Sequence, residues 1–434
     1  MISSAARMVL AVGLAAILLA TPVVGAEQVE ISFATWQLHD WYEEIIPEFH
    51  EAYPNIRVEY RPMHWGGWTN YTEQIVTQFV GGVAADVMNL PALGFPSVAG
   101  QGILMPLDEL IDRDRVEFDF ADFLPVAQEA MRWDGRTYGI TQNMGIWMAH
   151  FNEDKFAEGG LSNPVQLARG GAWTWDAMID STKRLARFDN SGENTQWGMI
   201  TYPEDAGIYP FVWGHGGRLL SEDGTESLIG EPEAVAGIAQ IQELMYRDRA
   251  LAFPWFTGVP QRAPWPESIN SGSFGLLLWW ATLTASFEGL QWESDEVPIP
   301  PGPNDPNTVP VQFNMISMSA QTQKREAAWE FVKFITGKEQ NAGMMALSPG
   351  RVPSRASLLP EYFDLQRREW SQEGTQLLLN SINRARLVPQ HQEFGRINDL
   401  NRRHLRPIWT NDEDPNIALQ ELDRQIDLLL AQPQ

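Results

Sequence analysis

Residues 30–60 read EISFATWQLHDWYEEIIPEFHEAYPNIRVEY, and this stretch decides the fold class. Residues 30–35 alternate in polarity and are rich in β-formers, which is typical of a strand. Residues 41–53 carry apolar side chains at helical spacing, and Pro54-Asn55 then forms a turn before a second strand at 56–60. The stretch therefore predicts a strand, a helix and a strand in succession, which favours an α/β fold.

The same alternation continues outward along the chain. Residues 69–79 predict a helix that Gly81-Gly82 ends, and residues 85–90 predict a short buried strand. Strands that alternate with helices in this way predict a parallel sheet. Further elements follow: a strand at 146–151, a helix at 174–187 with Thr174 as its N-cap, a proline-rich loop at 298–310, a strand at 311–319, and helices at 324–335 and 417–430.

The first 26 residues have the pattern of a secretory signal. Arg7 is the only charge, an apolar run extends from Met8 to Ala20, and Val24-Gly25-Ala26 suits cleavage before Glu27. The apolar run is too short for an ordinary membrane-spanning helix. The chain contains no cysteine, which excludes disulfides, cysteine-bound zinc and a lipid anchor on an N-terminal cysteine. We therefore expect a soluble protein in a bacterial periplasm.

The net charge and the length of the chain further limit its possible partners and its number of domains. Without Arg7 the chain keeps 30 Lys and Arg against 56 Asp and Glu, a net charge of −26. Such an acidic surface repels nucleic acid and anionic membranes. The length predicts two domains, and we expect a monomer.

Eighteen tryptophans are an unusually large number. Many stand beside Gly, Pro, Asn or His, as in Trp65-Gly66-Gly67-Trp68, rather than inside apolar runs. Loop positions of this kind often line binding clefts. The flat apolar face of an indole suits the C–H face of a pyranose, while carboxylates, amides and guanidinium groups suit its hydroxyls. The composition therefore favours a sugar as ligand, although any one of these tryptophans is equally compatible with packing.

The order of segments resembles the family 1 extracellular solute-binding proteins of ABC importers, which include the maltodextrin-binding proteins. No single motif carries the resemblance, but the joint order and spacing do. Phe151 replaces the tyrosine that usually precedes the asparagine at 152, and Ala85 replaces a proline; both are mild departures. The carrying segments are Ile31–Trp36, Pro47–Val58, Ala84–Val87, Gly100–Asp108, Asp134–Gly139, His150–Phe156, Thr174–Asp176, Ala327–Ile335 and Gly350–Pro353.

The resemblance implies a two-lobe periplasmic-binding-protein fold of type II, with discontinuous lobes joined by hinge strands. It places residues 27–142 and 307–352 in lobe one, and residues 143–306 and 353–434 in lobe two. It implies that the protein binds a carbohydrate by hinge closure and delivers it to the transmembrane permease of an ABC transporter. It implies no cofactor, no metal ligands among the site residues and no enzymatic activity.

The candidate ligand-binding residues are those expected where loops leave the carboxyl ends of strands or near the lobe crossings. Tryptophans are expected to stack on the ligand, and Asn, Gln, His and Arg to bond its hydroxyls. Packing is the alternative interpretation, above all for Trp147, which suits a core strand. The candidates are Trp36, Gln37, His39, Trp65, Trp68, Asn89, Asn143, Trp147, Trp213, His215, Trp279, Trp280, Asn314, Arg351 and, by family analogy, Glu393 and Phe394.

Other classes remain open at this point. A polyamine would use aromatic rings together with carboxylates, and a phosphoester such as glycerol phosphate would need Arg or helix N-termini in the cleft. An exported glycan-active enzyme would need two facing carboxylates. The chain has no nucleophile elbow, no His-Glu-x-x-His and no phosphate loop. The acidic loop at 411–416 lacks EF-hand spacing and is best interpreted as a solvated turn.

Overall fold

The computed structural model describes residues 28–202, 205–254, 262–264, 267–281, 290–347, 351–366 and 372–432. The predicted signal segment, residues 1–26, lies outside the described residues. Within the described residues, no helix combines the length and apolar character needed to cross a membrane.

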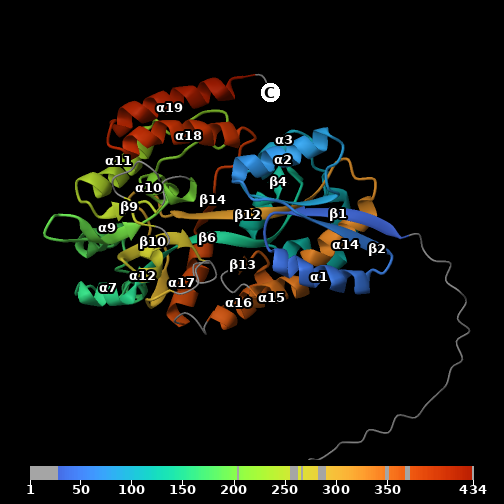
Figure 1. Cartoon of the computed structure of the whole chain (residues 1–434), viewed down its shortest axis with the longest axis horizontal. Coiled ribbons are helices and arrows are strands. Elements are labelled where there is room, and N and C mark those ends of the chain that lie inside the picture. Colours follow the sequence, from blue (N-terminus) through green and yellow to red (C-terminus); the bar gives the residue numbers. More distant parts are fainter. Residues whose placement is uncertain are drawn as a thin grey trace, which may run out of the picture.

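One continuous sheet runs through the molecule in the order β2-β1-β3-β12-β6-β10-β8-β7. Figure 1 shows β12 and β6 crossing its middle, with β1 and β2 toward one end and β10 toward the other. The strands of this path are β1 (Val29–Thr35), β2 (Ile56–Pro62), β3 (Val87–Leu90), β6 (Ile140–Asn152), β7 (Arg187–Phe188), β8 (Asn194–Ile200), β10 (Phe274–Trp280) and β12 (Val309–Met318). Short strands flank it: β9 (Leu251–Ala252), β11 (Ser294–Val297), β13 (Val352–Pro353) and β14 (Ala385–Leu387); β4 (Arg132–Trp133) and β5 (Arg136–Thr137) form a separate hairpin.

The prediction of a parallel sheet is correct for β2, β1 and β3 and for β10 with β8, but wrong for the middle of the sheet and for the short edge strand β7, which is antiparallel to β8. β1 is parallel to β2 and β3, and β10 is parallel to β8. β12, however, is antiparallel to β3 and β6, and β6 is antiparallel to β10. A long strand that runs between the two ends of the molecule here pairs antiparallel with its neighbours. The alternation of helices and strands in the sequence alone does not reveal this pairing.

β6 belongs to both halves of the sheet. Its residues 140–146 pair with β12, whereas residues 147–151 pair with β10. The sequence predicts only the second part, 146–151, as a strand. All of its residues except Gly145 are buried, and polar Thr141-Gln142-Asn143 continues the strand across the lobe boundary expected between residues 142 and 143.

Helices cover both faces of the half that contains β1. Figure 1 shows α2 and α3 on one face and α1 and α14 on the other. The helices of this half are α1 (His39–Ala52), α2 (Trp68–Val80), α3 (Phe95–Gly100), α4 (Asp108–Arg113), α5 (Arg115–Phe118), α6 (Pro125–Ala130), α14 (Arg325–Ile335), α15 (Lys338–Leu347) and α16 (Leu359–Gln366).

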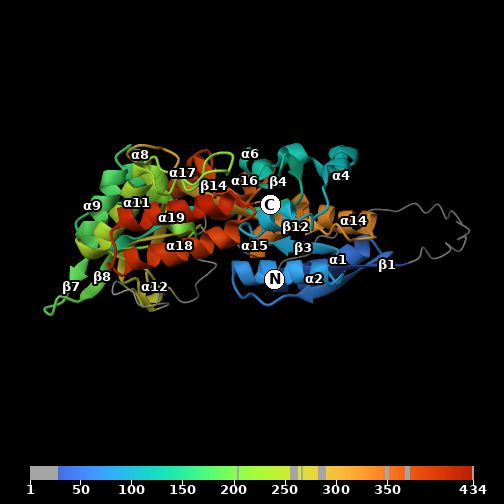
Figure 2. The same ribbon diagram turned by 90° about the horizontal axis from the view of Figure 1, so that it is seen from above.

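The half that contains β10 is also covered on both faces, and the two last helices lie along one side of it (Figure 2). Its helices are α7 (Glu153–Glu158), α8 (Pro164–Arg169), α9 (Trp175–Leu185), α10 (Tyr209–Gly214), α11 (Pro232–Tyr246), α12 (Glu267–Ser271), α17 (Gln372–Ile382), α18 (Phe394–Trp409) and α19 (Pro415–Leu430). Thr174 caps α9 as predicted, because its side chain accepts a hydrogen bond from the backbone N–H of Ala177.

Arg355 ties the segment after β13 to the β1 half. The guanidinium is 1 % exposed and lies 4.0 Å from the ring centroid of Phe123. It donates to the carbonyl oxygens of Phe118 and Thr336. These contacts favour a boundary between the lobes beyond residue 358 rather than at 353, and we propose that later position.

Candidate functional site

A cluster of tryptophans forms where β1 and β2 end. Trp36 directly follows β1, and its ring stacks on Trp65 with centroids 4.2 Å apart. Trp68, the first residue of α2, meets Trp65 edge-on at 4.8 Å. Trp36 and Trp65 follow neighbouring parallel strands, so their loops emerge at the same edge of the sheet. All three rings are only partly buried, which leaves aromatic surface at that edge.

A polar network lies behind this cluster. The Tyr42 hydroxyl donates to Gln142 Oε1 at 2.9 Å, and Asn89 Nδ2 donates to the Tyr42 hydroxyl at 3.4 Å. Burial raises the pKa of Tyr42, while the nearby Arg351 charge opposes that rise. The network thus joins the carboxyl end of β3 to β6 and places Arg351 beside it.

Two buried polar atoms of this region have no hydrogen-bond partner among the described residues. They are Nε1 of Trp36 and Oδ1 of Asn89. Buried polar atoms are normally satisfied, so a donor and an acceptor at this edge lack partners in this conformation, in which neither atom is exposed to solvent.

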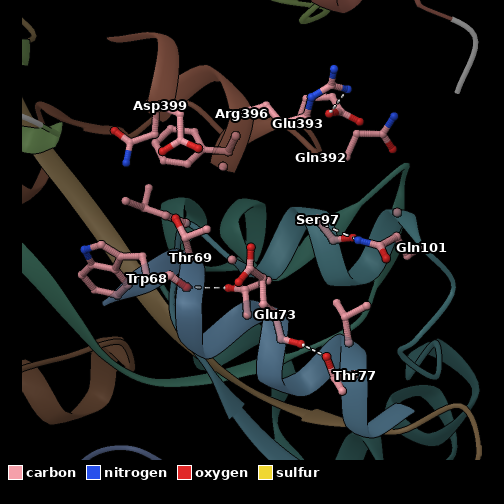
Figure 3. Close-up of a pocket in the computed structure, with 18 residues that line it drawn as sticks. Trp68, Thr69, Glu73, Thr77, Ser97, Gln101, Gln392, Glu393, Arg396 and Asp399 are labelled. Atoms are coloured by element: carbon pink, nitrogen blue, oxygen red, sulfur yellow. Dashed lines mark hydrogen bonds and ion pairs between the residues drawn. The ribbon is translucent and has the colours of Figure 1, made fainter. Parts of the chain in front are cut away.

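A cavity of about 700 Å³ adjoins the tryptophan cluster through Trp68. Figure 3 shows α2 and α3 on one side of it, and α18 with the loop before it on the other. Gln392, in that loop, lies against Gly100: a Cβ on Gly100 would stand 2.6 Å from Gln392 Oε1. The cavity therefore lies between helices of the two halves and is open to solvent on one side, as in a ligand cleft.

Carboxylates dominate the charge of the cavity. Glu73 on α2 and Asp399 on α18 are exposed on opposite walls. Arg396 lies on the same wall as Asp399, and its guanidinium pairs with Glu393 at 3.2 Å. Within the described lining, negative charge exceeds positive charge, which favours an uncharged or cationic ligand over an anion.

A second aromatic group lies at the end of β10. Trp279 and Trp280 are partly buried, and their ring centroids lie 6.1 Å and 5.2 Å from that of Trp147. The Trp280 ring covers Gly145, where a Cβ would stand 3.0 Å from it. This group therefore lies against β6 at the point where the strand paired with β6 changes from β12 to β10.

Two of the predicted stacking residues are packing residues in this structure. Trp147 is 2 % exposed and Trp213 is 1 % exposed. Trp213 stacks on Tyr209 with centroids 4.9 Å apart, and the Arg386 guanidinium covers the ring at 5.2 Å. Neither indole leaves a ring face for a ligand, so the stacking role predicted for them is wrong for this conformation.

Some of the other predicted residues line the cleft, and others hydrogen-bond to neighbouring elements of the structure. Glu393 and Phe394 line the cavity at the start of α18. Asn314 Oδ1 accepts from the backbone N–H of Ala92 and so supports the loop after β3. Asn143 is buried and donates to the sulfur of Met344.

His39 and Gln37 lie beside the cluster, whereas His215 lies apart from it. His39 Nδ1 is 2.6 Å from the Tyr60 hydroxyl, and Gln37 hydrogen-bonds Thr35 through its backbone. His215 follows α10 and contacts the Trp175 ring and the Phe211 carbonyl. The structure thus gives His215 a role in packing rather than in either aromatic group.

Most of the helical lining of the cavity is not among the residues predicted from the sequence. Thr72 and Glu73 on α2, Ser97 on α3, and Asn398 and Asp399 on α18 all line it. The signal was present in the helix predicted at 69–79, whose apolar stripe faces the core and whose opposite stripe must face solvent or a cleft.

The fold and this cleft define a two-lobe solute-binding protein. The sequence matches the family described as bacterial extracellular solute-binding protein over residues 35–342. The chain therefore belongs to that family, and the resemblance stated from the sequence is confirmed.

Solved structures of similar fold extend over nearly the whole chain. An ABC substrate-binding protein from Listeria monocytogenes, in complex with cycloalternan, has a TM-score of 0.79 and 21 % identity, covering 94 % of this chain and 100 % of that one. Maltose-bound MalE3 from T. maritima has a TM-score of 0.74 and 19 % identity, covering 92 % and 100 %. UgpB from Mycobacterium tuberculosis, in complex with glycerophosphocholine, has a TM-score of 0.74 and 15 % identity, covering 94 % and 99 %. These likenesses confirm the two-lobe α/β fold.

Proposed function

We propose that this protein is a periplasmic binding protein that captures a carbohydrate between its lobes and delivers it to the permease of an ABC importer. The observation that carries the proposal is the cluster of Trp36, Trp65 and Trp68 beside a cavity lined by α2, α3 and α18. Indole faces and unpartnered polar atoms in one place suit a ligand with apolar ring faces and many hydroxyls. Two of the solved neighbours hold sugars, which supports this ligand class.

Binding would act by shifting an equilibrium between open and closed lobes. A ligand that touches both lobes binds the closed form better and so increases its population. β6 and β12 are the continuous strands about which the lobes would move. The permease would then recognise the closed arrangement rather than the ligand itself. The predicted periplasmic location, monomeric state and lack of enzymatic activity are parts of the same proposal.

A polyamine is the second candidate, because the cavity combines Trp68 with Glu73, Glu393 and Asp399. Aromatic faces and carboxylates together suit an organic cation. A phosphoester ligand, like the one held by the M. tuberculosis neighbour, is disfavoured by the same carboxylates.

Calorimetry on the protein tests the proposal with three probes: maltotriose, spermidine and glycerophosphocholine. We expect heat from the neutral oligosaccharide and none from the phosphodiester. Trp65→Ala should weaken sugar binding at least tenfold, equivalent to about 1.4 kcal/mol. Phe188→Ala is the matched control, because Phe188 is an exposed aromatic residue on β7 whose ring lies under the Arg249 guanidinium, away from the tryptophan cluster. Binding of spermidine alone, or equal affinity in both variants, would overturn the carbohydrate assignment.

A further inference from the structure

His150 and Glu296 face each other in the interior of the β10 half. β6 lies between β10 and β11, and in this register His150 stands opposite Leu277 on one side and Glu296 on the other. Directly paired residues of antiparallel strands share a face of the sheet. The two side chains are 3 % and 0 % exposed, and His150 Nδ1 lies 3.4 Å from Glu296 Oε2.

The contact made by Nε2, the other ring nitrogen of His150, determines which atoms of the pair carry hydrogen. His150 Nε2 lies 3.0 Å from the carbonyl oxygen of Trp280, and a carbonyl only accepts, so Nε2 carries the hydrogen. A neutral imidazole then offers Nδ1 as an acceptor. Glu296 can satisfy that acceptor only as a protonated acid. Its carboxyl oxygens make no hydrogen bond in the described part of the chain, and Nδ1 lies 3.4 Å from Oε2.

Burial favours this neutral arrangement over an ion pair. Desolvation raises the pKa of Glu296 well above its ordinary range, and the charge of Asp295 adds to the rise. Desolvation also lowers the pKa of His150 to about 4. The ionisable groups described on the helices packed against these strands are Glu153, Asp154, Lys155 and Glu158 of α7, Arg169 of α8, and Asp176, Asp180, Lys183 and Arg184 of α9.

We propose that Glu296 is a positioning residue for the ligand: as a buried neutral acid it holds His150 in the tautomer that donates to Trp280. The carbonyl of Trp280 is thereby fixed where β10 ends, and with it the backbone that carries Trp279 and Trp280. The role in ligand binding rests on the proposed function, whereas the protonation of the pair does not.

The first test is the pH dependence of unfolding in urea for the full chain and for Glu296→Gln. The amide of glutamine donates to Nδ1 without taking up a proton. In the wild type the unfolded carboxyl ionises above its ordinary pKa of about 4.5 while the buried one stays protonated. The unfolding constant of the wild type should therefore rise tenfold per pH unit relative to Glu296→Gln, up to the folded-state pKa.

Glu293→Gln is the control for this measurement, because Glu293 is exposed in the loop just before β11. Its profile should run parallel to that of the wild type. A parallel profile for Glu296→Gln as well would overturn the proposal.

Nitrogen chemical shifts of the imidazoles provide a readout that needs no variant to fold. His150 should remain a neutral Nε2–H tautomer at pH 6, whereas an ordinary histidine is largely protonated there. Titration of His150 near pH 6.5 would overturn the neutral pair.

Ligand affinity separates positioning from mere stability. With maltotriose as the probe, Glu296→Gln should keep the wild-type affinity at pH 7, and Glu296→Ala should weaken it severalfold. Equal affinity of Glu296→Ala and wild type would overturn the positioning role. If the wild type bound no sugar, the proposed function would fail, and the unfolding profiles and imidazole shifts would still decide whether the pair holds its proton.

Discussion

At the scale of the residue, Trp36 combines a stacking face with a buried Nε1 that has no partner in the described residues. Trp36→Phe keeps the ring and removes the donor. If the ligand accepts from Nε1, affinity should fall about fivefold, equivalent to about 1 kcal/mol for one hydrogen bond, with stability unchanged. Titration calorimetry and urea unfolding on the same variant check this.

Trp292 supplies the opposite case for comparison. Its Nε1 donates to the Ile269 carbonyl at 2.6 Å, within the packing of α12. Trp292→Phe should lower stability by about 1 kcal/mol and leave ligand affinity unchanged. Unchanged affinity in Trp36→Phe would remove Nε1 from the site.

Arg355 anchors the segment after β13 to the half of the molecule that contains β1. It is buried between Phe118 and Phe123 and lies 3.5 Å from Asp122. Arg355→Ala would remove a partner from Asp122 and a donor from the carbonyls of Phe118 and Thr336, so we expect a loss of about 3 kcal/mol in the free energy of unfolding. Arg325→Ala, which breaks the exposed pair with Glu109, should cost under about 1 kcal/mol. Equal losses in the two variants would contradict the anchoring role.

At the scale of the element, replacing glycine by alanine should have opposite effects on stability at two positions. A Cβ on Gly198 of β8 would stand 1.7 Å from the carbonyl oxygen of Thr182 on α9, so Gly198→Ala must separate the helix from the sheet. Gly343 lies inside α15 with nothing within 4 Å of a Cβ. Gly343→Ala should raise stability by about 0.5–1 kcal/mol, whereas Gly198→Ala should lower it by 1–3 kcal/mol. Thermal and urea unfolding measure both, and stabilisation by Gly198→Ala would contradict the packing described.

Elements were also the scale at which the sequence was most informative. The opening strand and helix, the helix at 324–335 and the cap at Thr174 follow from local periodicity and capping chemistry, and the structure confirms them. Residues 140–145 were harder to predict, because buried Gln142 and Asn143 hydrogen-bond residues 100 to 201 positions away in the sequence. The same limit explains Trp213, whose burial depends on Arg386. Side chains whose partners are distant in sequence reveal neither burial nor exposure in their local pattern.

At the scale of the whole molecule, closure on a ligand has a measurable size and stability. The radius of gyration from X-ray scattering should fall when maltotriose is added, because the closed form is more compact. At 100 times its dissociation constant the ligand should add about 2.7 kcal/mol to the free energy of unfolding. Trp65→Ala at the same concentration should show smaller changes in both. Identical scattering with and without a ligand that demonstrably binds would contradict hinge closure.

The position of β12 between β3 and β6 also bears on how the chain is made. The first three strands of the path can associate early, but the central place in their sheet is filled only by residues 309–318. A ribosome must therefore complete about three quarters of the polypeptide before the N-terminal half of the sheet closes. Until then the N-terminal half of the sheet lacks its central strand, which would suit the export that the proposed function requires.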